Sequence, residues 1–374
     1  MAVIGGGPAG LAAAEAAASA GACTVVLERA EHPRYKTCGG GLIGTSLSIA
    51  ESRITVPARD TITAITFTDQ GRRAFTRHAT DRPFLTLVRR DEFDLAWSKA
   101  AVEAGAEVRQ NAQVKSLEQN DDAAVVTLAD GSRVTARTVI GAEGSAAISS
   151  RHVGVTFAQQ DLGLEVELAA TPADRAEWQG RVLLDWGAGP GSYGWVFPKG
   201  DELTVGVIMA KGRGAETKEY LALLLAQLGL SGRRVVRDSG HLTRCRHRDA
   251  PVRRGRVLVA GDAAGLLEPY TREGISYALR SGTWAGQVAA RAEGPADLAA
   301  YDALIERHLA PEMAAGGRLL DVFSRRRALT HAAMSTPLGW RAFEAFCRGD
   351  LSMAHALRRP GVRLAVGLLG GRAR

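Results

Sequence analysis

The sequence of 374 residues predicts an α/β fold in which a Rossmann-like domain is interleaved with an antiparallel-sheet domain and followed by a C-terminal helical region. Three observations support this prediction. The first thirty residues have the pattern strand, glycine turn, helix, strand, and a second cluster of glycines and acids lies at residues 261–275. The stretch between them is rich in strand patterns. Because nucleotide-type segments flank this stretch, the domains are expected to be discontinuous.

The N-terminal segment predicts a complete dinucleotide-binding βαβ unit. Gly5, Gly7 and Gly10 follow a short apolar strand at the G-x-G-x-x-G spacing, and an alanine-rich helix and a second apolar strand come next. Gly5 permits the tight turn, Gly7 lets backbone N–H groups approach a pyrophosphate, and Gly10 lets the helix pack closely on the strand. Glu28 ends the second strand, where it can accept hydrogen bonds from ribose hydroxyls. These features leave NAD and FAD equally open.

Composition and charge narrow the class of protein. The chain is 46% hydrophobic and 23% charged, which is typical of a globular protein. A net charge of +7 and a pI near 9.5 favour acidic partners such as a pyrophosphate, nucleic acid or an anionic membrane surface. Aromatic residues are only 6% of the chain and do not interleave with basic ones, so nucleic acid is the least favoured of these.

Cysteine spacing and hydropathy favour a cytoplasmic protein. Cys23, Cys38, Cys245 and Cys347 form no C-x-x-C pair, so neither a metal site nor a disulfide framework is expected. Outside the first βαβ unit no run of apolar residues is long enough for a membrane span, which predicts a soluble protein, peripheral at a membrane at most. The first strand is short and directly follows Met1, which favours a trimmed or misassigned start.

The remaining elements follow in order along the chain. A pair of strands is expected, the first over residues 61–68, joined by a hairpin turn at 71–73. A helix over 90–104 closed by Gly105 and strands over 107–109, 125–128, 134–136 and 138–140 come next. Residues 164–168, 181–186 and 203–208 alternate in polarity. They predict a mostly antiparallel sheet with one solvated or ligand-facing side.

Two segments in this order suggest contact with a ligand. Three consecutive glycines follow Cys38, which indicates either backbone packed against a flat or anionic group or a flexible surface loop. Tyr193, Trp195 and Phe197 fall on one face of a strand because they are spaced by two. They form either an aromatic wall suited to a flat ring or an apolar chain, or ordinary core.

The second glycine cluster follows a buried strand at residues 256–260. Asp262 can hydrogen-bond a chain of hydroxyls, and the N–H groups that open a helix predicted over 275–292 can polarise an acceptor atom. From residue 297 the chain is predicted to be helical and is rich in arginine. Residues 355–374 fit either a solvated helix face or a basic amphipathic surface for peripheral membrane contact.

Several motifs together resemble a known superfamily. Residues 5–10 with Glu28, the R-x-x-F-D segment from Arg90, G-A-E-G at 141–144 with Arg151, and Gly261-Asp262 resemble the flavoprotein hydroxylases with the p-hydroxybenzoate hydroxylase fold. Within that superfamily, K-T-C-G-G-G-L at 36–42, Y-x-W-x-F-P-K at 193–199 and G-D-A-A-G at 261–265, followed by E-G-I, resemble the geranylgeranyl reductase family. That family saturates C=C bonds of isoprenoid chains with reduced FAD. The resemblance spans roughly residues 1–290.

The resemblance implies an extended FAD site. The ADP part would be held by the first turn and the end of the second strand, namely Gly5, Gly7, Pro8, Ala9, Gly10, Glu28 and Arg29. The rest of the cofactor would be contacted by Cys38, Gly39, Gly40, Arg90, Gly261, Asp262, Gly274 and Ile275. Cys38 would be a catalytic proton donor or relay, with packing of the glycine loop as the alternative. The isoprenoid pocket would be lined by Tyr193, Trp195 and Phe197.

The implied domains are discontinuous. Residues 1–57, 84–155 and 237–295 would form the FAD-binding domain, residues 58–83 and 156–236 the substrate-binding sheet, and residues 296–374 the helical region. Two positions depart from the family pattern. Glu143 replaces an Asp, which lengthens the side chain near the expected nicotinamide contact, and Arg272 replaces a Gly at the mouth of the flavin site.

The implied activity is hydride transfer from reduced FAD to an isoprenoid C=C bond, with NADPH or a reduced carrier as external electron donor. An isolated alkene is a poor hydride acceptor, so a dry pocket and a proton delivered in the same event are required. An FAD-dependent monooxygenase that hydroxylates or epoxidises a small hydrophobic molecule is the alternative, because the fold does not decide between them. A flavin-binding or lipid-carrier protein without catalysis is a third reading.

Overall fold

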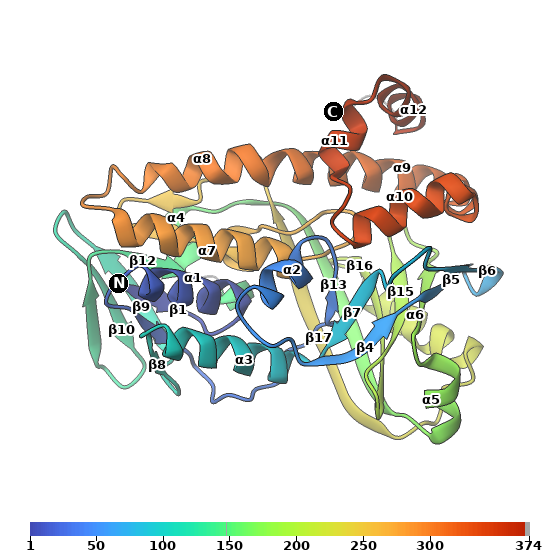
Figure 1. The fold of residues 1–374 in the computed structure, drawn as a ribbon, viewed down its shortest axis with the longest axis horizontal. Helices are drawn as coiled ribbons and strands as arrows, with labels where there is room; N and C mark the ends of the chain where they lie inside the picture. Colours follow the sequence, from blue (N-terminus) through green and yellow to red (C-terminus); the bar gives the residue numbers. More distant parts are fainter. Residues whose placement is uncertain (147, 371–374) are drawn as a thin grey trace.

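The computed structural model describes residues 1–146 and 148–370, and it contains the predicted α/β architecture. A six-stranded sheet lies toward one end of the molecule and a seven-stranded sheet toward the other (Figure 1). The first has the order β18-β19-β12-β1-β2-β8 and the second the order β17-β13-β16-β15-β14-β5-β6.

The six-stranded sheet is the nucleotide-type sheet predicted from the N-terminus. Its strands are β1 (Ala2–Ile4), β2 (Val25–Leu27), β8 (Glu107–Arg109), β12 (Val139–Gly141), β18 (Arg253–Arg254) and β19 (Val257–Val259). All pairs are parallel except β18 with β19. The central strands β1, β12 and β19 are fully buried apolar runs, as expected for a parallel sheet covered on both faces.

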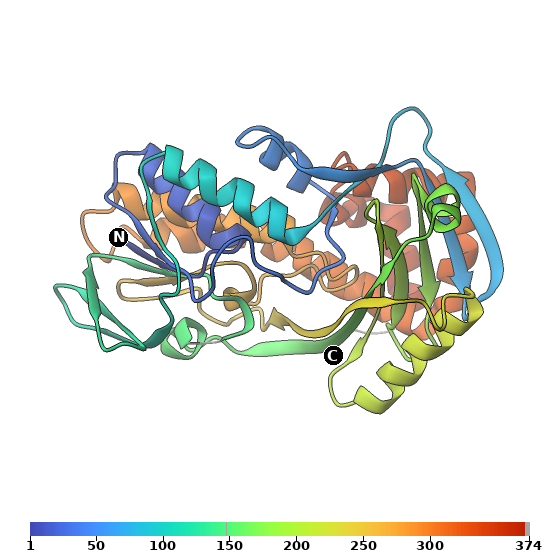
Figure 2. The ribbon, with the colours of Figure 1, turned by 90° about the horizontal axis from the view of Figure 1, so that it is seen from below.

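Three helices cover one face of this sheet: α1 (Pro8–Ser19), α3 (Arg90–Glu103) and α7 (Ile275–Arg291). Figure 2 shows α1 and α3 side by side. Helices α1 and α7 approach so closely that a Cβ at Gly282 or Gly286 would lie 2.1 Å from the carbonyl oxygen of Ala9 or Ala13. Small residues at these contacts therefore fix how near the second glycine cluster comes to the first.

The seven-stranded sheet is mostly antiparallel, with one parallel pair, β14 with β5. Its strands are β5 (Ala64–Asp69), β6 (Arg72–His78), β13 (Phe157–Ala169), β14 (Arg181–Trp186), β15 (Tyr193–Pro198), β16 (Glu202–Ala210) and β17 (Val235–Arg246). Helix α6 (Gly214–Gln227) packs on β13 and β16. The expected domain boundary between residues 236 and 237 falls inside β17.

Two smaller sheets and several short helices complete this part of the fold. One sheet contains β9 (Val114–Gln119), β10 (Ala124–Leu128) and β11 (Arg133–Ala136), and the other contains β3 (Gly41–Leu42), β4 (Ala58–Ile62) and β7 (Leu85–Val88). The short helices are α2 (Ser46–Glu51), η1 (Gly144–Ala146), α4 (Ile148–Val153), α5 (Pro172–Trp178) and η2 (Gly261–Ala264).

The strand pair predicted around the turn at residues 71–73 is confirmed, because β5 pairs antiparallel with β6, but residues 61–68 do not form one strand. The segment is divided between β4 and β5, which belong to different sheets. The break comes at Thr63, where the amides of Thr63 and Ala64 both bond the carbonyl of Gly180, at 2.9 and 3.0 Å. Both strands have period two, so the polarity pattern runs through the break without marking it.

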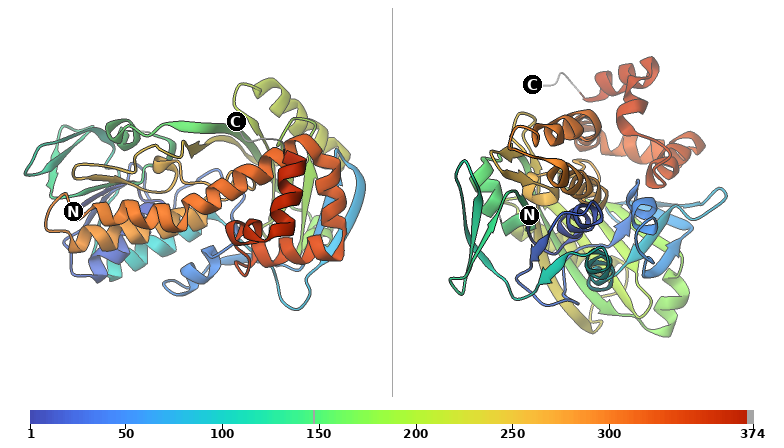
Figure 3. Two further views of the ribbon diagram at one scale, coloured as in Figure 1. Left: turned by 90° about the horizontal axis from the view of Figure 1, so that it is seen from above. Right: turned by 60° about the vertical axis from the view of Figure 1, so that its left-hand side comes forward.

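The C-terminal region is helical, as predicted. It contains α8 (Ala299–His308), α9 (Ala310–Ser335), α10 (Pro337–Cys347), α11 (Met353–Arg358) and α12 (Pro360–Gly370). Helix α9 runs along the molecule, and α10 to α12 gather at the end that holds the seven-stranded sheet (Figure 3). Within residues 1–146 and 148–370, no helix is both long and apolar enough to cross a membrane.

Candidate active site

One cavity of about 510 Å³ runs from the first glycine turn to the aromatic strand β15. It contacts nearly every residue predicted for the site: Gly5, Gly7, Pro8, Ala9, Glu28, Arg29, Cys38, Gly39, Gly40, Arg90, Asp262, Gly274, Ile275, Tyr193, Trp195 and Phe197. Gly10 and Gly261 lie behind its wall. A Cβ at Gly10 would lie 1.9 Å from Gly5 O, and Gly261 N donates to Ser281 Oγ at 3.0 Å, so both shape the turns that carry lining residues.

The glycine turn presents free backbone to the cavity. Gly5 has φ +99°, and a Cβ there would lie 2.6 Å from Ala142 O, so only glycine fits. At Gly7 the nearest atom to a Cβ would be Arg34 Nη2, at 3.6 Å, so that position is open. No side chain caps the N-terminus of α1, which leaves its first N–H groups available to an anion such as a pyrophosphate.

Glu28 is buried against this turn. Its Oε2 accepts from Gly6 N at 2.6 Å and its Oε1 accepts from Ala30 N at 3.0 Å. The carboxylate therefore fastens the glycine turn to the end of β2. Contact with a ribose, for which the sequence singled out Glu28, remains a prediction.

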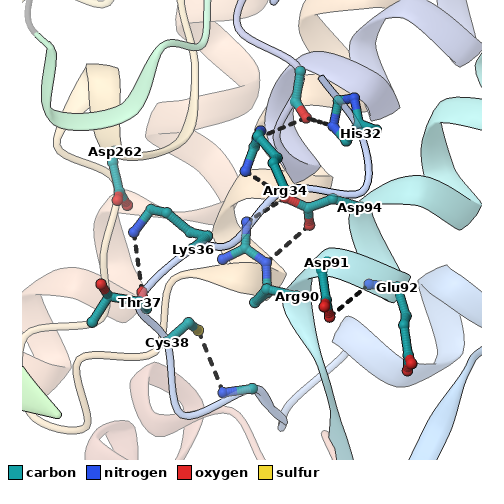
Figure 4. A network of polar contacts seen from close by, with 12 residues as sticks. His32, Arg34, Lys36, Thr37, Cys38, Arg90, Asp91, Glu92, Asp94 and Asp262 are labelled. Carbon is teal, nitrogen blue, oxygen red and sulfur yellow. Dashed lines mark hydrogen bonds and ion pairs between the residues drawn. The ribbon is translucent and has the colours of Figure 1, made fainter. Parts of the chain in front are cut away.

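Arg34 is a lining residue that the sequence analysis missed. Its Nη2 donates to Gly6 O at 2.8 Å, its Nε lies 3.4 Å from Glu28 Oε1, and its Nη1 lies 3.3 Å from Asp94 Oδ2. His32 Nε2 also contacts Gly6 O, at 2.9 Å (Figure 4). In the sequence, Arg34 is a basic residue in a loop between two segments expected to contact the cofactor. That pattern alone does not predict where the loop lies in the fold.

Three cationic side chains line the cavity: Arg34, Lys36 and Arg90. In Figure 4 the guanidinium groups of Arg34 and Arg90 both contact Asp94, whereas the Lys36 ammonium group points toward Asp262. Arg90 forms a bidentate pair with the fully buried Asp94, with both N–O distances 2.9 Å. Burial opposes the charge of Arg90, but Asp94 and then Cys38 raise its pKa above its usual value. Burial, followed by the charge of Arg90, lowers the pKa of Lys36. Because Glu28 and Asp94 pair with the two arginines, the wall offers an anionic part of a cofactor charged N–H donors more than a net positive charge.

Three contacts anchor the Cys38 loop, which lies between the two ends of the cavity. Cys38 N donates to Glu165 Oε1 at 3.2 Å, Cys38 O accepts from Lys199 Nζ at 3.3 Å, and Gly40 O accepts from Val88 N at 2.9 Å. Gly40 N donates to Cys38 Sγ at 3.4 Å. The three glycines following Cys38 were interpreted either as packed backbone or as a flexible surface loop, and these contacts support packed backbone.

Asp262 lies on the opposite wall, at η2. Its Oδ2 is 3.4 Å from His241 Nε2. Burial opposes ionisation of Asp262, but the hydrogen bond and charge of His241, with the charges of Lys36 and Arg90, hold its pKa below the usual range. A carboxylate at this point can accept hydrogen bonds from hydroxyls in the cavity.

The far end of the cavity is an apolar chamber. Tyr193, Trp195 and Phe197 point into it as one wall of β15, with successive ring centroids 5.9 and 6.4 Å apart. The alternating residues of the strand are buried on the other side. Helix α10 closes the chamber with Phe343, Phe346 and Cys347, a contribution from the tail that the motifs did not predict.

The two departures from the family pattern have clear structural settings. Glu143 accepts hydrogen bonds from Ser149 N and Oγ, both 2.6 Å, so it caps α4; burial raises its pKa. Arg272 has φ +57°, a conformation that favours glycine, and its Nε lies 3.1 Å from Asp161 Oδ2.

In residues 1–146 and 148–370, no group of three or more His, Cys, Asp or Glu side chains is arranged to hold a metal ion. All four cysteines are free.

The fold and this cavity define a flavoprotein with a Rossmann-like cofactor domain. The FAD binding domain family matches residues 1–303, so the chain belongs to this family of FAD-dependent oxidoreductases. The residues present fit FAD, because an open turn at Gly7, a helix N-terminus without a side-chain cap and three cationic side chains lie along one cavity.

Two curated relatives and one solved structure are similar to this chain. Geranylgeranyl diphosphate reductase of Rhodobacter capsulatus is 28% identical over 309 residues, which cover 79% of this chain and 77% of that protein. Digeranylgeranylglycerophospholipid reductase 3 of Methanosphaera stadtmanae is 27% identical over 310 residues, covering 78% and 77%. The structure of a geranylgeranyl bacteriochlorophyll reductase-like protein from Thermoplasma acidophilum has a TM-score of 0.80 at 21% identity, covers 98% of each chain and shares the fold.

Proposed function

We propose that this protein is an FAD-dependent reductase that saturates C=C bonds of an isoprenoid, geranylgeranyl-type chain. One observation carries the proposal: a single cavity joins an FAD-type glycine turn to an aromatic chamber, and the Cys38 loop lies between them. The names of the curated relatives support an isoprenoid or lipid substrate.

The ADP part of FAD would lie along the first turn, where α1 offers its N-terminus and Arg34 adds positive charge. Asp262 would accept hydrogen bonds from cofactor hydroxyls, and Gly274 and Ile275 would bring the start of α7 close to the ring. When bound and reduced, FAD supplies the hydride that adds to one carbon of the C=C bond.

The chain's own residues would orient the substrate and exclude water. Tyr193, Trp195 and Phe197 offer flat apolar surface to an isoprenoid, and Phe343 and Phe346 close the chamber from the other side. A dry chamber matters because an unactivated alkene is reduced only if it is held in place and receives its proton in the same event.

Cys38 would deliver that proton from Sγ to the second carbon. The sulfur belongs to a loop fixed by Glu165, Lys199 and Val88, which gives it a defined position in the cavity wall. The alternative role of Cys38 is packing of the glycine loop.

The decisive experiment is anaerobic. Chemically reduced, FAD-loaded protein is mixed with geranylgeranyl diphosphate or a prenylated lipid, and flavin absorbance and product mass are followed. Reoxidation with a product two hydrogens heavier is expected. NADPH-driven oxygen consumption with a hydroxylated or epoxidised product would instead establish the monooxygenase, and a bound flavin that nothing reduces or reoxidises would favour a carrier protein.

We further propose a cytoplasmic protein that receives electrons from NADPH or a reduced carrier and contacts membranes peripherally through α12. Leu364 and Leu368 are 65% and 76% exposed on this helix, beside Arg363. Sedimentation with anionic liposomes should fall as salt rises. Binding that ignores ionic strength would argue against the basic surface.

A further inference from the structure

Strand β13 carries a row of acids on one face, and one of them, Glu165, lines the cavity. Asp161, Glu165 and Glu167 alternate with apolar residues, among which Leu164, Val166 and Leu168 pack on the other face of the sheet. Gly163 takes the remaining place in the row. Asp161 is paired with Arg272, whereas Glu165 faces the cavity and is only 2% exposed.

Only one of the two carboxyl oxygens of Glu165 has a hydrogen-bond partner among the described residues. Its Oε1 accepts from Cys38 N at 3.2 Å, and among the described residues its Oε2 has no hydrogen-bond partner. Buried polar atoms are nearly always bonded, so an unpartnered oxygen in a cavity wall points to a function in that cavity.

A glycine on the neighbouring strand β16 leaves space beside Glu165. Glu165 pairs with Gly206 on β16, and a Cβ at Gly206 would lie 2.1 Å from the Trp195 ring. The indole thus occupies the space beside Glu165. Trp195 Nε1 is also without a partner in the described part of the chain, and it lies 3.3 Å from where a Cβ of Gly39 would be. Both free polar atoms are therefore beside the Cys38 loop.

The charges around Glu165 come from several elements. Lys199 and Lys36 favour its ionised form, as does the bond from Cys38 N, and Glu167 opposes it. Tyr35 also interacts with it. Burial is the largest influence and raises the pKa of Glu165 above its usual value.

We propose that Glu165 is the acid that returns a proton to Cys38 after each reduction, an inference that rests on the proposed function. The C=C π bond breaks, and the hydride and the Cys38 Sγ proton form the two new C–H bonds. The cofactor is oxidised by two electrons and Sγ becomes a thiolate. The Glu165 proton then re-forms the S–H bond, and the carboxylate is reprotonated from water. Oε1 of Glu165 accepts from the Cys38 amide, which ties its carboxyl group to the residue that carries Sγ.

The test compares Glu165→Gln with Glu165→Asp in FAD-loaded protein. Gln keeps an oxygen that can accept from Cys38 N but has no proton to give, whereas Asp keeps the acid on a shorter side chain. If Glu165 supplies the proton, E165Q should retain FAD and lose steady-state turnover by about 100-fold or more, the usual contribution of an acid. E165D should recover part of it. Glu118→Gln, which changes an exposed acid on β9 away from the cavity, should retain turnover.

A second measurement is independent of activity. The infrared difference spectrum of wild type minus E165Q at pH 7 should contain the C=O band of a protonated carboxylic acid. Absence of the band, or wild-type turnover in E165Q, overturns the inference and leaves the proposed function intact. Failure of the proposed function would appear differently, as no reoxidation of the wild-type flavin by any prenylated substrate.

Discussion

At Arg272, backbone strain and a buried ion pair have opposite effects on the free energy of unfolding, and their magnitudes can be compared. Its φ of +57° is left-handed, which costs a residue with a side chain about 1–2 kcal/mol. Against this, its side chain pairs with Asp161, and the two side chains are only 5% and 4% exposed. Arg272 Nη1 also donates to Tyr270 O at 2.8 Å. The strain persists because these contacts hold the residue in place.

The magnitudes predict the sign of a substitution. Arg272→Gly relieves the strain but leaves Asp161 buried without its partner, and breaking a buried pair costs roughly 3–5 kcal/mol. The net effect is a loss of about 1–4 kcal/mol. Arg272→Ala breaks the same pair without relieving the strain, so it should be less stable than Arg272→Gly by about 1 kcal/mol.

Thermal unfolding of the FAD-loaded protein checks the order wild type, R272G, R272A, from highest to lowest midpoint. Adding Asp161→Asn to R272G removes the unpaired charge and should recover most of the loss, whereas D161N alone should be destabilising. An R272G midpoint equal to or above that of wild type would refute the reasoning, because the ion pair would then contribute less than the strain costs.

Four further outcomes are expected. Cys38→Ser should retain FAD but lose turnover at least about tenfold, and unchanged turnover would return Cys38 to a packing role. Gly7→Ala should leave the thermal midpoint of the FAD-free protein unchanged and weaken FAD binding in a fluorescence titration. Gly10→Ala should lower the thermal midpoint itself, because its Cβ would lie 1.9 Å from a carbonyl oxygen. Phe346→Ala should enlarge the chamber and raise the turnover of bulkier prenyl chains relative to shorter ones, measured by product mass. Burial raises the pKa of Glu273 to about 8, so folding favours its protonated form. This group's contribution to the stability of the FAD-free protein should be complete below about pH 4.5 and should be lost as pH rises toward 8. Glu273→Gln should flatten that pH dependence in denaturant titrations.

The cofactor end of the site could be predicted from sequence because its signals are local. The glycine spacing, the small residues of α1 and the acid at position 28 lie within one βαβ unit, so their placement follows from local geometry. The sequence did not predict that Glu28 would bond the amide of Gly6. Arg34 could not be placed in the same way. Its side chain donates to the carbonyl oxygen of Gly6, and no periodicity in the sequence predicts that contact.

The apolar end shows a different limit. The aromatic spacing in β15 indicated a wall, but the opposite wall comes from α10, about 150 residues later along the chain. An amphipathic helix reveals which of its faces is buried, and it does not reveal the surface it will meet. Phe343 and Phe346 therefore read as ordinary helix core until the tertiary fold brings them to the chamber.

The two most specific motifs in the chain form one structural unit. Lys199, which ends the aromatic motif, donates to Cys38 O, and a Cβ at Gly39 would lie 3.0 Å from the Phe197 ring. The glycine loop can approach the aromatic strand only because it lacks side chains, and the strand in turn holds the loop. A substitution in the strand that alters chain selectivity should therefore also shift the sulfur of Cys38. If the proposed function holds, substrate choice and proton delivery are coupled through this contact.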